Sequence, residues 1–161
     1  MHTAQFLSPS TEDYLETIFT IVSRNKVARS KDIAGKMKVK LPSVTGALKA
    51  LAEKKLVNYQ PHSYITLTAE GEKIARCVDR KHHVLTDLFT EVFMLPKEDA
   101  EKTACRMEHG MTTGVCEALN CLLMAVRNDE TLARKLREGI AAEQSNCYCS
   151  EFCKDATAQK E

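Results

Sequence analysis

The sequence predicts a mainly α-helical protein that begins with a winged helix-turn-helix and continues with a second, helical domain. Apolar residues recur at helical spacing along most of the chain, and six glycines and four prolines among 161 residues leave room for long helices. Two strand-like runs, residues 56–59 and 64–67, follow the third predicted helix, and three helices before a β-hairpin are the winged-helix pattern. We expect a winged-helix domain over residues 1–70, a helical domain over 71–143 and a cysteine-rich tail over 144–161.

Local signals predict the three helices of the first domain. The first begins near Ser8, and the second covers residues 31–37 behind Ser30, because hydroxyl side chains cap helix N-termini. The third carries Pro42 in its first turn, where a proline is tolerated. The expected core residues are Leu15, Ile18, Phe19 and Val22, then Ile33, Ala34 and Met37, then Val44, Leu48 and Leu51.

The second domain is expected to be built from four helices. They cover residues 69–94, 96 to 107 or 109, 115–126 and 129–142. Thr68 caps the first of them, and His82 lies on its apolar stripe. The segment 115–126 is apolar over most of its circumference, which favours burial, often against a second subunit.

Positive charge is concentrated in one segment, although the net charge of the chain is only +1. Residues 24–55 hold ten basic and two acidic side chains, a charge of +8 that leaves −7 for the rest. This separation indicates a polyanionic partner, and a solvated lysine-rich surface is the alternative. The polar face of the third predicted helix carries small and basic side chains, which suit the DNA major groove as well as an ordinary surface helix. The expected contacts to double-stranded DNA are Lys40, Ser43, Thr45 and Lys49, with Lys36 and Lys38 on phosphates.

Composition and hydropathy indicate the cellular setting. The N-terminus lacks the basic start and apolar run of a signal peptide, and no stretch approaches the roughly 20 apolar residues that span a bilayer. We therefore expect a cytoplasmic protein without a membrane partner. Seven cysteines in a reducing compartment favour metal or redox chemistry over a disulfide scaffold.

One predicted helical turn offers three different metal ligands. Cys105, Glu108 and His109 stand at positions i, i+3 and i+4, which share one face of a helix. The donors that could complete the shell lie in two other segments and are Asp13, Glu16 and His82. Each donor alone has a structural explanation, as a hydrogen-bonded core histidine, a pair of acids at a helix N-terminus or a small buried thiol. Together they favour a metal site, and with the basic segment they suggest a metal-sensing DNA-binding protein.

Five segments match a known family in register: residues 11–18 (TEDYLETI), 43–45 (SVT), 67–71 (LTAEG), 80–82 (RKH) and 105–109 (CRMEH). Over about residues 8–125 the chain resembles the metal-dependent repressors of the diphtheria toxin repressor and manganese transport regulator family. The resemblance implies a homodimer that binds operator DNA once divalent metal is bound, and no enzymatic activity or small-molecule substrate. The metal ligands that it implies are Asp13, Glu16, His82, Cys105, Glu108 and His109.

The implied ligands combine features of two branches of this family. Asp13 and Glu16 resemble the manganese-sensing branch, whereas Cys105 resembles the iron-sensing branch. A thiolate is softer than a carboxylate, so we favour Fe(II) over Mn(II), with Zn, Co or Ni possible in vitro. Two adjacent metal sites are plausible, with Glu16 and Glu108 able to bridge them.

The tail carries a separate group of soft ligands, Cys147, Cys149 and Cys153. A zinc site, an iron–sulfur site, a redox switch and a tail without a specific role remain open for these thiols. An alternative function is therefore a winged-helix repressor that senses redox state or zinc. An enzyme is disfavoured, because no oxyanion feature accompanies Cys105 and His109 and the paired Glu-x-x-His motifs of di-iron bundles are missing.

Overall fold

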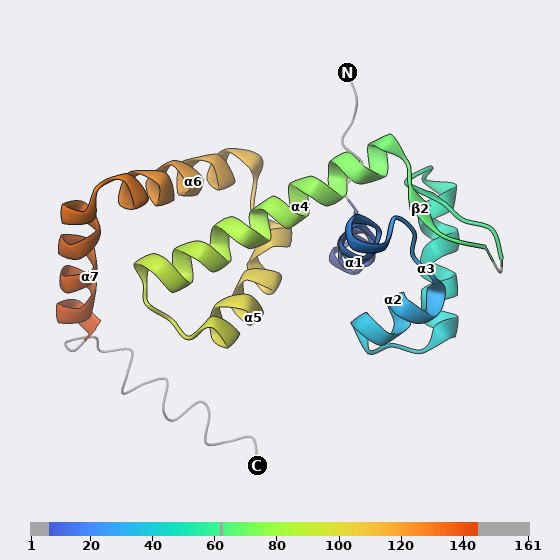
Figure 1. Ribbon diagram of the computed structural model, residues 1–161, viewed down its shortest axis with the longest axis horizontal. Helices are drawn as coiled ribbons and strands as arrows, with labels where there is room; N and C mark the ends of the chain where they lie inside the picture. The colour runs from blue at the N-terminus through green and yellow to red at the C-terminus, as the bar shows by residue number, and fades with distance from the viewer. Residues whose placement is uncertain (1–6, 62, 145–161) are drawn as a thin grey trace, which may run out of the picture. The chain divides into compact units, whose positions relative to one another are not determined.

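The computed structural model describes residues 7–61 and 63–144, which divide into two compact units (Figure 1). Unit 1 consists of the residues up to His83 together with Ala104–Met111, and unit 2 consists of Val84–Thr103 and the residues from Thr112 onward. The helices are α1 Pro9–Asn25, α2 Ser30–Met37, α3 Leu41–Glu53, α4 Ala69–Asp87, α5 Lys97–Met107, α6 Thr113–Asn128 and α7 Glu130–Gln144. The strands β1 Val57–Asn58 and β2 Thr66–Leu67 form an antiparallel hairpin. The predicted mainly α-helical, winged-helix fold is confirmed. The two compact units are defined by packing alone, so they do not test the predicted domain boundary after residue 70, which stays a prediction.

The caps of the first two helices differ in kind. Ser8 caps α1 as predicted, since its hydroxyl oxygen accepts the backbone N–H of Thr11 at 3.3 Å. Ser30 was predicted to cap the second helix, and this was wrong. Ser30 is the first residue of α2, and Arg29 occupies the cap position without a side-chain hydrogen bond. Helix α2 therefore depends on packing more than on capping.

Helix α1 is central to the packing of unit 1. It contacts α2, α3 and β2, and its Leu15 and Ile18 are fully buried. Ile33 of α2 and Leu48 of α3 are equally buried in the same core. Full burial of one such side chain contributes roughly 1.5–3 kcal/mol. A shift of α1 would therefore disturb both helices of the helix-turn-helix.

A close backbone contact joins the hairpin to the start of α4. The strands pair Val57 with Leu67, and Thr68 then caps α4 as predicted, because its hydroxyl accepts the N–H of Gly71 at 3.1 Å. A Cβ at Gly71 would lie 1.9 Å from the carbonyl oxygen of Leu56. Only glycine fits this approach of two backbone segments.

Unit 2 packs α6 and α7 against the chain that follows α4. The predicted helix over residues 69–94 is α-helical only to Asp87 and continues as a π-helical turn, Leu88–Val92. Arg137 Nε donates to the backbone oxygen of Glu91 at 2.8 Å, so a side chain from α7 satisfies a carbonyl of this turn. Arg127 of α6 also pairs with Asp87 and Glu91, at 2.7 and 2.9 Å. Within the described residues, no helix combines the length and the apolar character needed to cross a membrane.

Candidate metal centre and DNA-contact surface

The six predicted metal ligands all belong to unit 1. Helix α1 supplies the two carboxylates Asp13 and Glu16, and α4 supplies His82. Cys105 lies near the end of α5, and Glu108 and His109 lie in the 3-10 turn Glu108–Gly110 that follows it. Three segments remote in sequence therefore meet within one compact unit.

Glu108 is the only buried charged side chain among the described residues, with 0% of its surface exposed. Its Oε2 accepts a hydrogen bond from His82 Nδ1 at 2.7 Å. Its Oε1 has no hydrogen-bond partner among the described residues, and His109 Nε2 lies 3.6 Å from it. A buried carboxylate oxygen without a partner is costly, so this oxygen marks a place for a cation.

The imidazole of His109 lies between two carboxylates of α1. Its Nδ1 lies 2.7 Å from Glu12 Oε2, and its Nε2 lies 2.9 Å from Asp13 Oδ1. Burial lowers the pKa of His109, but the hydrogen bond to Glu12 and the negative charges of Asp13 and Glu108 outweigh burial and raise it. The carboxylates of α1 therefore favour the protonated form of this ring.

Two donor groups share Glu108. Each offers three ligand atoms within 4.8 Å of one another, and the groups are Asp13, Glu108 and His109, then Glu16, His82 and Glu108. Oxygen and imidazole donors at this spacing suit divalent manganese, iron or zinc. The donor chemistry and the unpartnered Glu108 oxygen thus both fit a divalent cation. Five of the six predicted ligands come together, and their role as ligands stays a prediction.

Cys105 belongs to neither donor group, and its side chain is exposed. Burial and the negative charges of Glu108 and Asp13 raise the pKa of its thiol. Burial and the charge of Glu108 also raise the pKa of Glu16. In the absence of a cation the acidic groups therefore repel one another. The thiol of Cys105 lies close enough for the same negative charges to disfavour its thiolate form.

Sequence reasoning missed Glu12. Its carboxylate binds His109, 97 positions along the chain. An acid in the first turn of a helix is usually explained by the helix dipole, and only the fold brings this acid to His109. No local pattern in the sequence distinguishes these two explanations.

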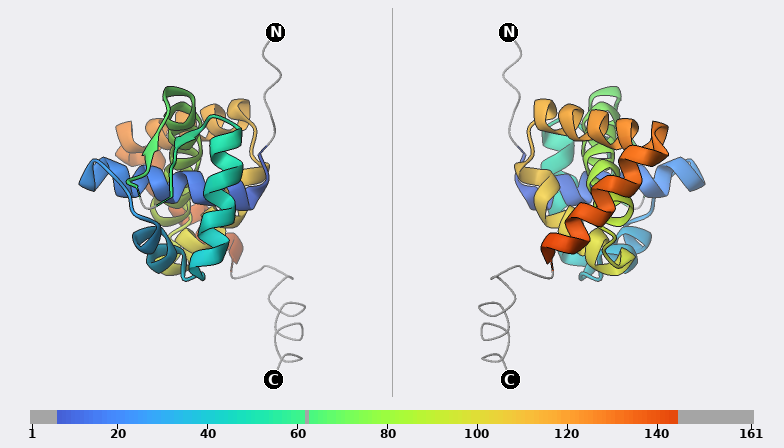
Figure 2. Two further views of the ribbon diagram at one scale, coloured as in Figure 1. Left: turned by 90° about the vertical axis from the view of Figure 1, so that its right-hand side faces the viewer. Right: turned by 90° about the vertical axis from the view of Figure 1, so that its left-hand side faces the viewer.

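Figure 2 (left) shows α3 beside the hairpin, and the predicted DNA contacts Ser43, Thr45 and Lys49 belong to α3, with Lys40 at its N-cap. Lys40, Ser43 and Lys49 are exposed, whereas the hydroxyl of Thr45 donates to the backbone oxygen of Leu41 at 3.1 Å. Thr45 and Lys49 line a groove whose further residues are Arg29, Ser30, Lys31, Leu41, Tyr59, Pro61, Ser63 and Tyr64.

Two groove residues that were not predicted form a fixed pair. Arg29 donates to the hydroxyl of Tyr64 at 2.9 Å, and its guanidinium lies 5.1 Å from the centre of that ring.

The two predicted phosphate contacts, Lys36 and Lys38, are both exposed. Burial and the charge of Arg24 lower the pKa of Lys36, while Glu16 opposes this change. The ammonium group of Lys36 therefore interacts electrostatically with Glu16 of the candidate metal centre.

Comparison with known proteins decides the family. Residues 6–64 match the iron dependent repressor N-terminal DNA binding domain, and residues 68–134 match the iron dependent repressor metal binding and dimerisation domain. An HTH-type transcriptional regulator of Methanocaldococcus jannaschii is 30% identical over 118 residues, which cover 73% of this chain and 94% of that protein. The chain belongs to the iron-dependent repressor family. The regulator MntR of Shouchella clausii is 28% identical over 131 residues, 81% of this chain and 91% of its own length.

Solved structures of this family share the fold. IdeR of T. acidophilum aligns with a TM-score of 0.60 at 28% identity over 67% of this chain, and the manganese regulator SloR with 0.64 at 27% over 73%. This chain spans only 51% and 54% of those two chains, about half of their length. Family membership places the protein among metal-dependent DNA-binding transcriptional repressors, a family with iron- and manganese-responsive members.

The predicted soft-ligand cluster Cys147, Cys149 and Cys153 lies outside the described residues.

Proposed function

We propose that this protein is a divalent-metal-activated repressor that binds operator DNA as a homodimer and controls genes of metal-ion homeostasis. The observation that carries the proposal is Glu108, a fully buried carboxylate shared by two donor groups and left with one oxygen unpartnered. Burying such a charge without full pairing destabilises the metal-free subunit, and a positive charge placed beside it would offset that cost. A bound divalent cation supplies that compensation as positive charge.

The residues of α1 link the metal centre to DNA binding. Asp13 and Glu16 stand on one side of the helix, and the buried Leu15 and Ile18 extend from it into the core shared with α2 and α3. When a cation neutralises these carboxylates, they no longer repel one another, and α1 is held in a single position. Because α1 packs against α3, the groove beside α3 is then also held in a single conformation for DNA binding.

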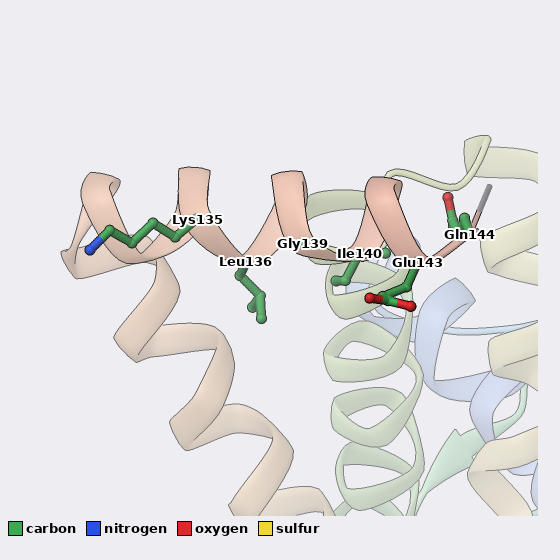
Figure 3. A pocket seen from close by; sticks show the side chains of 6 residues that line it. All are labelled: Lys135, Leu136, Gly139, Ile140, Glu143 and Gln144. Carbon is green, nitrogen blue, oxygen red and sulfur yellow. The ribbon is translucent and has the colours of Figure 1, made fainter. Parts of the chain in front are cut away.

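Homodimerisation is supported by apolar surface in unit 2. Val115 and Leu122 of α6 are seven residues apart and so lie on one face of the helix, where they expose 49% and 42% of their surface. Helix α7 adds an apolar groove in which Leu136 and Ile140 lie on the same side (Figure 3). Exposed apolar patches of this kind mark interaction sites, and a two-fold dimer would bury them against the same patches of a second subunit.

For the metal we propose Fe(II), supported by the thiol of Cys105 close to the carboxylates of both donor groups. Mn(II) is the second candidate, because the five residues of the two tight donor groups offer oxygen and imidazole ligands alone. Anaerobic titrations of the wild-type protein and of Cys105→Glu with both metals separate the candidates. A thiol ligand predicts that the substitution weakens Fe(II) binding more than Mn(II) binding, and an equal change for both metals would favour Mn(II).

The function itself is tested by an anaerobic mobility-shift titration of operator DNA with chelator, Fe(II) or Mn(II). We expect at least one of the metals to raise DNA affinity tenfold or more, a coupling of about 1.4 kcal/mol. Equal affinity in chelator and in both metals would show that the protein is a constitutive DNA-binding protein. The operator lies in the cytoplasm, so we expect the protein there.

A further inference from the structure

We propose that Glu12 is a positioning residue for the metal centre, which holds the His109 ring so that its Nε2 faces the cation. The inference rests on the proposed function and deepens it, because Glu12 belongs to neither donor group. It begins from the hydrogen bond between Glu12 Oε2 and His109 Nδ1, at 2.7 Å.

The two nitrogens of His109 have different surroundings. Nε2 lies 2.9 Å from Asp13 Oδ1 and 3.6 Å from Glu108 Oε1, the other two members of its donor group. Nδ1 faces Glu12 alone among the carboxylates in contact with the ring. A histidine that binds a metal through one nitrogen commonly donates its other N–H to a carboxylate, which fixes the tautomer and the ring orientation. Glu12 stands where that carboxylate is needed.

The setting of Glu12 favours this role over that of a simple helix-dipole acid. The N-terminus of α1 is already capped by Ser8. Glu12 is only 19% exposed, and so is more enclosed than Asp13 at 39%, although Asp13 is the expected ligand. A carboxylate that served only the helix dipole needs no side-chain partner, whereas Glu12 makes a 2.7 Å hydrogen bond to His109.

The test compares Glu12→Gln with Glu70→Gln, a matched control in the first turn of α4 that touches no donor group. Mn(II) affinity of the full chain is measured by electron paramagnetic resonance of the free ion. We expect Glu12→Gln to weaken Mn(II) binding by 10- to 100-fold, the usual cost of losing a carboxylate behind a ligating histidine. The control should bind like wild type, and Glu12→Asp should bind better than Glu12→Gln.

A second measurement separates positioning from a general structural effect. In the Zn(II)-loaded wild-type protein, nitrogen-15 NMR of His109 should show a proton on Nδ1 and metal on Nε2, and in Glu12→Gln this Nδ1 proton resonance should shift upfield. In chelator, Glu12→Gln and Glu70→Gln should each still unfold in one cooperative transition, which shows that a loss of Mn(II) affinity does not come from misfolding.

Three results would overturn the inference. Unchanged Mn(II) affinity in Glu12→Gln would overturn it alone, and so would metal bound to Nδ1. Failure of the wild-type protein to bind Mn(II) or Zn(II) would overturn the proposed function and this inference with it.

Discussion

Replacing Glu108 by glutamine tests the metal centre most directly. Glutamine keeps the shape of the side chain and an oxygen that accepts from His82, while it removes a buried charge. In chelator we therefore expect a free energy of unfolding equal to or above that of wild type, since an incompletely paired buried charge costs more than it contributes. At a metal concentration of 100 Kd, wild type gains about 2.7 kcal/mol, or roughly 5–10 °C in Tm. Because Glu108 belongs to both donor groups, a loss of at least about 100-fold in affinity is expected, which reduces that gain to about 0.4 kcal/mol.

The assay is thermal unfolding at one protein concentration, with and without Mn(II), for wild type, Glu108→Gln and Glu101→Gln. Glu101 lies on α5, the helix that precedes the 3-10 turn of Glu108, is exposed and forms only a 3.7 Å pair with Lys97, so its variant should keep the full shift. The reasoning fails if Glu108→Gln keeps the metal-induced shift. It also fails if the variant is strongly destabilised in chelator, since Glu108 would then be a structural ion-pair partner.

Three further predictions concern the fold, the pH response and DNA binding. Gly71→Ala should lower the free energy of unfolding in urea by about 1–3 kcal/mol or more, because its Cβ would lie 1.9 Å from a backbone carbonyl oxygen, whereas Gly35→Ala, with open space, should raise it by about 0.5–1 kcal/mol. Mn(II) affinity should fall between pH 8 and pH 6, because the pKa values of Glu16 and His109 are both raised and protons then compete with the metal; a flat profile in isothermal titrations would contradict this. Lys49→Ala should weaken DNA binding and reduce the slope of log affinity against log salt by about 1, with Mn(II) affinity unchanged.

The parts of the fold that the sequence could predict are those set by neighbouring residues. The apolar spacing of Leu15 and Ile18, the Ser8 cap and the Thr68 cap are local, and all are confirmed. The end of α4 is not local. Its change to a π-helical turn coincides with a hydrogen bond from Arg137, 46 positions beyond Glu91, and no local pattern contains that contact.

The candidate site divides in the same way. The i, i+3, i+4 pattern places Glu108 and His109 together, and the structure brings Asp13 to them, while the role of all three as ligands stays a prediction. The same pattern counted Cys105 as an equal member, yet it lies on α5 while Glu108 and His109 lie in the tighter 3-10 turn that follows. Glu12 was missed because its partner is set by tertiary structure.

The position of the donors on α1 suggests how metal occupancy reaches DNA. Residues two apart on an α-helix point about 200° apart, so Asp13 and Leu15 lie on nearly opposite sides of α1, as do Glu16 and Ile18. One side faces the donors, and the other is close-packed against Ile33 and its neighbours. A close-packed core passes on a displacement because it has no voids in which to absorb it. A change in the charge balance at the carboxylates therefore acts on α2 and α3 through the rigid helix between them. On the proposed function, the buried and partly unpartnered Glu108 destabilises the metal-free subunit, and a bound cation would relieve that cost.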